Sequence, residues 1–153
     1  MNLEIERRFL VDESSFKFPI KKKRIKQAYL LSDSKQALRV RKIESDYFLT
    51  YKYKKSGINR YEFEYPISKD DGDKLMSLSD TYVIVKDRYY KNINDHLWEI
   101  DVFLNENKGL IIAEIELSDE NEKINLPDWV GEEISTDEKY LNFNLSKVPF
   151  SIW

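Results

Sequence analysis

The sequence has 153 residues, which suits one domain with its own core, and it carries no cysteine. Disulfides, thiolate nucleophiles and cysteine zinc sites are therefore excluded. Charged residues make up 35% of the chain, yet the net charge is only −3, which argues against a general nucleic-acid binder. The first residues show no signal-peptide pattern, and no apolar stretch is long enough to cross a membrane. We therefore expect a cytoplasmic protein with a single domain over residues 1–153.

Alternation of apolar and polar residues with period two predicts strands along most of the chain. The expected strands cover about residues 2–11, 23–31, 36–43, 46–54, 58–67, 82–93, 96–104 and 110–117. Polar connections such as SDSK at 32–35 and KSGIN at 55–59 have hairpin length. The sheet should therefore be mostly antiparallel.

One helix is expected at about residues 68–79. Ser68 is suited to the N-cap, Asp70 and Asp71 fall in the first turn, and Leu75 belongs to an apolar stripe. Gly72 weakens this pattern. After residue 117 the alternation stops, so the tail is expected to form short irregular or helical pieces that pack on the sheet.

The charges of the strands follow a pattern that alternation alone does not explain. Residues i and i+2 of a strand share one face, and seven of the expected strands carry two like charges at this spacing. A solvated face accounts for any one pair. Single-sign pairs on many strands instead indicate a ligand that offsets their repulsion, because an ordinary surface mixes its signs. The pairs are Glu4/Glu6, Arg39/Arg41, Lys52/Lys54, Glu62/Glu64, Lys86/Arg88, Glu99/Asp101 and Glu114/Glu116.

These charges indicate phosphate chemistry assisted by a metal ion. The carboxylate pairs would form an oxygen-only cluster, which favours Mg²⁺ or Mn²⁺, and the cationic pairs would form a wall that binds phosphate oxygens. The charges would then line a polar barrel whose outer face is covered by the helix and the tail. His96 is the only histidine and lies beside an expected turn, so the nucleophile should be water or a substrate hydroxyl.

The stretch EIERRFLV at 4–11 resembles the ExExK opening of the CYTH domain, the family of triphosphate tunnel metalloenzymes. The similarity is greatest to the short bacterial members, whose best-attested activity is hydrolysis of inorganic tripolyphosphate. It implies a mainly β (α+β) fold, a closed eight-stranded antiparallel β-barrel with a few helices packed outside. The resemblance continues through RIKQAYL at 24–30, LRVRK at 38–42, YFLTYKYKKSGINRYEFEYPI at 47–67, KDRYY at 86–90, LWEIDVF at 97–103, GLIIAEIEL at 109–117 and PDWVGEEI at 127–134.

The resemblance also implies roles for individual residues. Metal ligands would be Glu4, Glu6, Glu114 and Glu116, with Glu62, Glu64 and Asp101 as further ligands. Glu99 would instead hold a neighbouring cation. Triphosphate contacts would be Lys26, Arg39, Arg41, Lys52, Lys86 and Arg88, and Lys54 belongs to the same cationic wall.

Arg8 departs from the family pattern, because it stands where ExExK has lysine. Arginine keeps the charge and can bind phosphate, but it cannot transfer a proton near neutral pH. Lys86 is therefore expected to assist water or the leaving group, and the residues expected to carry catalysis are Lys86, Glu4, Glu6 and Glu116.

The favoured function is metal-dependent hydrolysis of inorganic tripolyphosphate by activated water. Nucleoside or thiamine triphosphates are alternative substrates, and an adenylate cyclase would use a ribose hydroxyl in place of water. A module that binds triphosphate or polyphosphate without turnover is an alternative from another class. The expected partner is a small-molecule triphosphate, without nucleic acid or membrane, and the chain would act as a monomer or homodimer.

Overall fold

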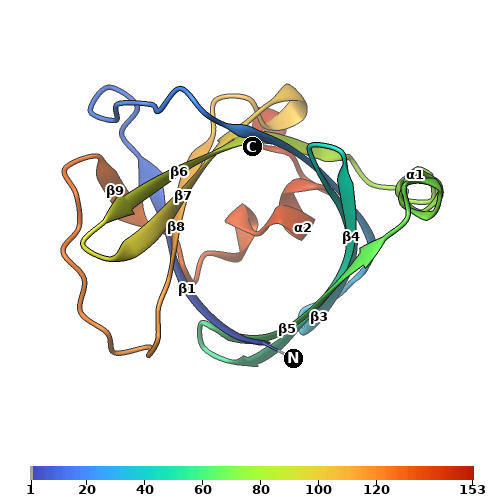
Figure 1. Cartoon of the computed structure of the whole chain (residues 1–153), viewed down its shortest axis with the longest axis horizontal. Coiled ribbons are helices and arrows are strands. Elements are labelled where there is room, and N and C mark those ends of the chain that lie inside the picture. Colours follow the sequence, from blue (N-terminus) through green and yellow to red (C-terminus); the bar gives the residue numbers. More distant parts are fainter. Residues whose placement is uncertain (1) are drawn as a thin grey trace.

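The computed structural model describes residues 2–153 and contains a closed antiparallel barrel (Figure 1). Two helices accompany it, α1 (Lys69–Ser77) and α2 (Asn142–Leu145), together with three short 3₁₀ turns. The strands are β1 (Asn2–Val11), β2 (Lys23–Ser32), β3 (Gln36–Ile43), β4 (Asp46–Ser56), β5 (Asn59–Ile67), β6 (Ile84–Ile93), β7 (His96–Phe103), β8 (Ile111–Glu116) and β9 (Val130–Glu133).

The strand order around the barrel is β5-β4-β3-β2-β6-β7-β8-β1, and β1 closes the ring by pairing with β5. The closing register runs from Asn2 opposite Glu62 to Ile5 opposite Asn59. Farther along β1, the same edge pairs with β9, with Phe9 opposite Glu133. The first eight strands confirm the expected barrel. The four-residue β9 was not expected, because VGEE offers no alternation long enough to predict a strand.

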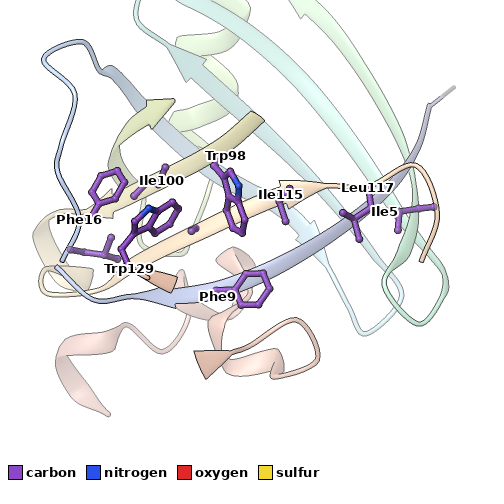
Figure 2. Packing of buried hydrophobic residues seen from close by; sticks show 10 residues of the cluster. Ile5, Phe9, Phe16, Trp98, Ile100, Ile115, Leu117 and Trp129 are labelled. Carbon is purple, nitrogen blue, oxygen red and sulfur yellow. The ribbon is translucent and has the colours of Figure 1, made fainter. Parts of the chain in front are cut away.

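The main apolar core lies outside the barrel wall. Phe9, Trp98 and Ile115 lie on the outer faces of β1, β7 and β8 (Figure 2). They pack with Phe16 and Trp129 from two loops that cross this face, and the Phe16 and Trp129 rings meet edge to face at 4.9 Å between centroids. Burial on the outer side leaves the inner side of these strands free to carry charge.

Helix α1 covers a second part of the outer wall, as expected. The Ser68 side chain accepts a hydrogen bond from the Asp71 amide and caps the helix. Gly72 faces the ring of Tyr47 so closely that an added Cβ would lie 2.1 Å from Cδ1 of that ring. The glycine that weakens the helical pattern is therefore what lets the helix approach the barrel.

The C-terminal tail enters one end of the barrel. Leu145 of α2 and Tyr140 pack against Ile84, Phe103 and Ile112. The strand register places these three residues on the inner face, since Ile112 lies opposite Leu10 and Phe103 opposite Lys86. Figure 1 accordingly shows α2 within the ring of strands. Both helices were expected outside the barrel. This is confirmed for α1 and wrong for α2, which covers apolar residues on the inner face of β6, β7 and β8.

Within residues 2–153, no helix combines the length and apolar character needed to cross a membrane.

Candidate functional site

The barrel interior holds a polar cavity of about 550 Å³. Strand alternation builds it, because side chains two apart on each strand point to the same side. Lys26 and Asp101, both expected in the site, are absent from its lining. The expected site residues that do line it are Glu4, Glu6, Arg8, Arg39, Arg41, Lys52, Lys54, Glu62, Glu64, Lys86, Arg88, Glu114 and Glu116.

Lys52 of β4 neutralises one part of the carboxylate cluster. Its Nζ lies 2.8 Å from Glu4 Oε1 and 3.2 Å from Glu62 Oε2. Burial alone would raise the pKa of Glu4, but the Lys52 ammonium outweighs burial and holds this pKa well below its usual range. Burial likewise lowers the pKa of Lys52, and the charges of Glu4 and Glu6 more than reverse this effect. Both groups are therefore charged at neutral pH.

Glu6 and Glu116 lie directly opposite each other on β1 and β8, and within residues 2–153 neither forms an ion pair. Like charges in this position repel. Burial, followed by the charges of Glu114 and Glu4, raises the pKa of Glu6 well above its usual value. Burial and Glu4 also raise the pKa of Glu116. Among residues 2–153 this pair therefore has no ion-pair partner, and Lys52 offsets only part of the rise in the two pKa values.

The donor set of Glu4, Glu6 and Glu116 fits a hard divalent cation in its chemistry. All its ligand atoms are carboxylate oxygens, which such cations prefer. Burial and neighbouring carboxylates raise the pKa values of Glu6 and Glu116, and a bound cation would offset this effect. As the side chains stand, no three carboxylate or histidine groups in the described part of the chain converge at metal-ligand spacing. Glu4 contacts Lys52, and Glu114 contacts Arg8.

A second network holds Lys86 and Arg88 of β6 against Asp101 of β7. Lys86 Nζ lies 2.7 Å from Asp101 Oδ2, and the Arg88 guanidinium donates to both carboxylate oxygens at 2.6 and 2.8 Å. Asp101 is fully buried and does not line the cavity. It therefore holds two cations in place, which is the role expected for Glu99; Glu99 itself also pairs with Arg88. Burial lowers the pKa of Lys86 to about 8, against the opposing charge of Asp101.

Arg41 of β3 is held by a third carboxylate. Its Nη2 donates to Glu64 Oε1 at 2.6 Å, and the Thr50 hydroxyl donates to the same oxygen at 2.9 Å. Burial would raise the pKa of Glu64, but Arg41 and its neighbours keep it below the usual range. Glu64 is thus paired with a cation of the barrel wall.

Arg8 connects the cavity to the tail. Its Nε donates to Glu114 at 3.1 Å, and its Nη2 donates to the main-chain oxygen of Tyr140 at 3.0 Å. The remaining nitrogen, Nη1, is buried and has no partner. A lysine has a single terminal nitrogen, so it could not occupy these three positions together.

The expectation that Lys26 faces the tunnel requires correction. Lys26 lies opposite Lys42 on the exposed outer face, whereas Gln27 lies opposite Arg41 and points inward. The run KKKRIK offers no alternation that fixes which residues face inward, and a shift of one residue exchanges the two faces.

Arg60 was missed by sequence reasoning and lines the cavity opposite Lys54 and Glu4. It lies two residues before Glu62 on β5 and therefore on the same face. This spacing could have identified Arg60 as an inward-facing residue.

The CYTH domain model matches residues 2–151, almost the whole chain. This chain belongs to the CYTH domain family. Triphosphate tunnel metalloenzymes of this family depend on a metal ion.

Relatives of this CYTH protein agree in length and fold. An inorganic triphosphatase from Acetivibrio thermocellus is 40% identical over 151 residues, covering 98% of this chain and 97% of the relative. One from Nitrosomonas europaea is 32% identical over 147 residues, covering 91% of this chain and 93% of the relative. The crystal structure of an inorganic triphosphatase superposes with a TM-score of 0.68 at 31% identity, covering 95% of each chain.

Proposed function

We propose that this CYTH protein hydrolyses inorganic tripolyphosphate with the help of a divalent cation. The observation that carries the proposal is the combination, in one cavity, of a cationic wall and the carboxylate pair of Glu6 and Glu116, which has no cation of its own. A polyanion and a metal ion together would neutralise both sets of charges. The inorganic triphosphatases at 40% and 32% identity support the choice of substrate.

The cationic side chains bind the phosphates and orient them. Arginine forks match pairs of phosphate oxygens, and lysines add compact charge. The buried Nη1 of Arg8 is available for such a contact, because its other two nitrogens are already engaged. The proposed phosphate contacts are Arg8, Arg39, Arg41, Lys52, Lys54, Lys86 and Arg88.

Glu4, Glu6 and Glu116 would hold the metal ion, and Mg²⁺ or Mn²⁺ suits their oxygen atoms. Glu62, Glu64 and Glu114 line the same cavity and are available as further ligands. When bound, such an ion supplies positive charge to phosphate oxygens and favours ionisation of water.

Lys86 is the residue placed to move a proton. With a pKa of about 8 it carries its proton at neutral pH, and Asp101 fixes its position. Water would attack the terminal phosphorus in line while the phosphoanhydride bond on its far side breaks. Lys86 would donate a proton to the departing pyrophosphate oxygen, and the proton lost by the attacking water would return to Lys86 through solvent. Phosphate and pyrophosphate are the products.

The test is phosphate release from tripolyphosphate with Mg²⁺, with Mn²⁺ and with chelator. ATP and thiamine triphosphate are run in parallel, and cyclic AMP is measured as a separate product. We expect metal-dependent release that is fastest with tripolyphosphate. Tight binding without release under both metals would identify a binding module, and formation of cyclic AMP would identify a cyclase.

A further inference from the structure

Gln27 is a buried polar side chain that has no role in the proposed mechanism. It is fully buried on the inner face of β2, and neither its amide oxygen nor its amide nitrogen has a hydrogen-bond partner. Buried polar groups are nearly always paired, and an unpaired amide lowers stability. A side chain of similar size without polar atoms would fill the same space without this penalty.

The register shows which group Gln27 can serve. It lies directly opposite Arg41 on β3 and opposite Ile84 on β6. Ile84 offers no polar atom, whereas Arg41 has a buried Nε that also lacks a partner. An amide oxygen accepts and an arginine Nε–H donates. Side chains directly opposite on neighbouring antiparallel strands are close enough to meet.

In this structure, Arg41 is held by Glu64. Its Nη2 donates to Glu64 Oε1 at 2.6 Å, and the Thr50 hydroxyl donates to the same oxygen at 2.9 Å. This contact turns the guanidinium toward Glu64 and partly cancels its charge. A triphosphate in the cavity would compete with Glu64 for the same nitrogens, because arginine pairs well with phosphate.

We infer that Gln27 positions Arg41 when the tunnel is occupied, by accepting a hydrogen bond from its Nε. A neutral acceptor orients the guanidinium and leaves its full charge for the phosphate. A carboxylate, such as Asp101 beside Arg88, holds an arginine but also offsets its charge. Gln27 does not line the cavity, so it acts behind Arg41 as a positioning residue, and its inferred role rests on the proposed triphosphate function.

The test replaces Gln27 with methionine, which has similar length and no hydrogen-bonding group of comparable strength. We expect Gln27→Met to melt at or above the wild-type temperature, because two unpaired buried atoms disappear. We expect its KM for tripolyphosphate with Mg²⁺ to rise about tenfold while kcat stays within about twofold. A residue that only supported packing would show the opposite pattern, a lower melting temperature with an unchanged KM.

Two further variants isolate the contact. Val40→Ile alters a fully buried residue on the outer face of β3, beside Arg41 in sequence, and should leave KM unchanged. Arg41→Lys removes the Nε, so Gln27→Met should add little to the KM of the Arg41→Lys variant. Additive effects of the two substitutions would overturn the inference.

Binding without turnover separates this inference from the proposed function. The rise in melting temperature that tripolyphosphate with Mg²⁺ produces is measured for the wild type and for Gln27→Met. No rise and no turnover in the wild type would contradict the proposed function. An equal rise in both proteins, with equal KM, would contradict the role of Gln27 alone. Failure of Gln27→Met to fold would contradict the premise that the amide destabilises the empty protein.

Discussion

Arg8 makes two contacts through different nitrogens of its guanidinium, which the single terminal nitrogen of lysine could not reproduce. The guanidinium contacts Glu114 and the Tyr140 carbonyl and still presents Nη1. In Arg8→Lys, we expect KM for tripolyphosphate to stay level or rise by up to about tenfold, because the fork to phosphate is lost, with little change in kcat. Steady-state kinetics across pH measure both. A tenfold rise in kcat, about 1.4 kcal/mol off the barrier, would show that this position takes part in proton transfer.

Glu116 tests the metal assignment more cleanly than Glu4. Loss of the Glu4 charge would leave the partly buried Lys52 ammonium with Glu62 as its one remaining ion-pair partner among residues 2–153. Glu116 forms no ion pair within residues 2–153, and burial, followed by the charge of Glu4, raises its pKa. We expect Glu116→Gln to keep its melting temperature and to lose at least about a hundredfold in activity, since a metal ligand is removed. Glu13→Gln, on an exposed loop, is the matched control. Near-normal turnover of Glu116→Gln at ordinary Mg²⁺ concentration would contradict the assignment of Glu116 as a metal ligand.

Helix α1 depends on one close approach. Because the added Cβ of Gly72→Ala would overlap the Tyr47 ring, we expect this variant to lose about 1–3 kcal/mol of unfolding free energy despite the better helix propensity of alanine. Urea unfolding measures the loss. Lys74→Ala, on an exposed position of α1, should change stability by less than about 0.5 kcal/mol. A stabilised Gly72→Ala would mean that the helix can move away from the barrel without penalty.

The sequence predicted most elements of the barrel, because alternation is strong where one face is apolar and the other charged. Phe9 and Trp98 alternate with Arg8 and Glu99, so both the strand and its inner face could be predicted. Lys26 was misplaced because four of the five residues before it are lysine or arginine, so the run shows no clear alternation of charged and apolar residues. Asp101 was assigned to metal because a sequence shows the carboxylate and not its burial between Lys86 and Arg88.

The short helical pieces of the tail were expected, but the position of α2 inside the barrel and the strand β9 could not be predicted, for a different reason. Their positions depend on contacts between residues far apart in the sequence. Leu145 packs in the same cluster as Ile112, and β9 pairs with the C-terminal part of β1. Local patterns contain no information on such contacts.

At the scale of the whole molecule, the two charge sets should respond together to ligands. Under the proposed function, tripolyphosphate with Mg²⁺ would bind the folded state alone and should therefore raise the melting temperature. The full shift should need both components, because the anion without metal leaves Glu6 and Glu116 without a positive partner. Thermal unfolding with each component alone and with both provides the comparison. An equal shift with metal-free tripolyphosphate would show that the two sets are independent.

The metal-free protein should lose stability as pH rises from 5 to 7. Burial and neighbouring charge raise the pKa of Glu6, and the pKa values of Glu62, Glu99 and Glu116 move in the same direction. Above the pKa of an exposed glutamate, about 4.3, the folded protein keeps protons that the unfolded chain has released, so unfolding free energy falls with rising pH.

Urea unfolding in chelator at pH 5, 6 and 7 measures this slope, and Glu6→Gln should reduce it. Saturating Mg²⁺ should also flatten the slope, because the ion favours the ionised carboxylates in the folded state. A slope that is the same in wild type and Glu6→Gln would mean that Glu6 does not titrate in this range.

The position of β1 in the barrel has a consequence for the order in which the protein folds. The hairpins β2–β3, β3–β4, β4–β5 and β6–β7 join neighbours in sequence, but β1 pairs only with β5, β8 and β9. During synthesis, β1 emerges first and has no partner until residues 59–62 are available, and its longer pairing waits for residues 112–116. We therefore expect the strand that carries Glu4, Glu6 and Arg8 to join last, so that the cavity forms in the final step of folding, slowly and through contacts distant in sequence.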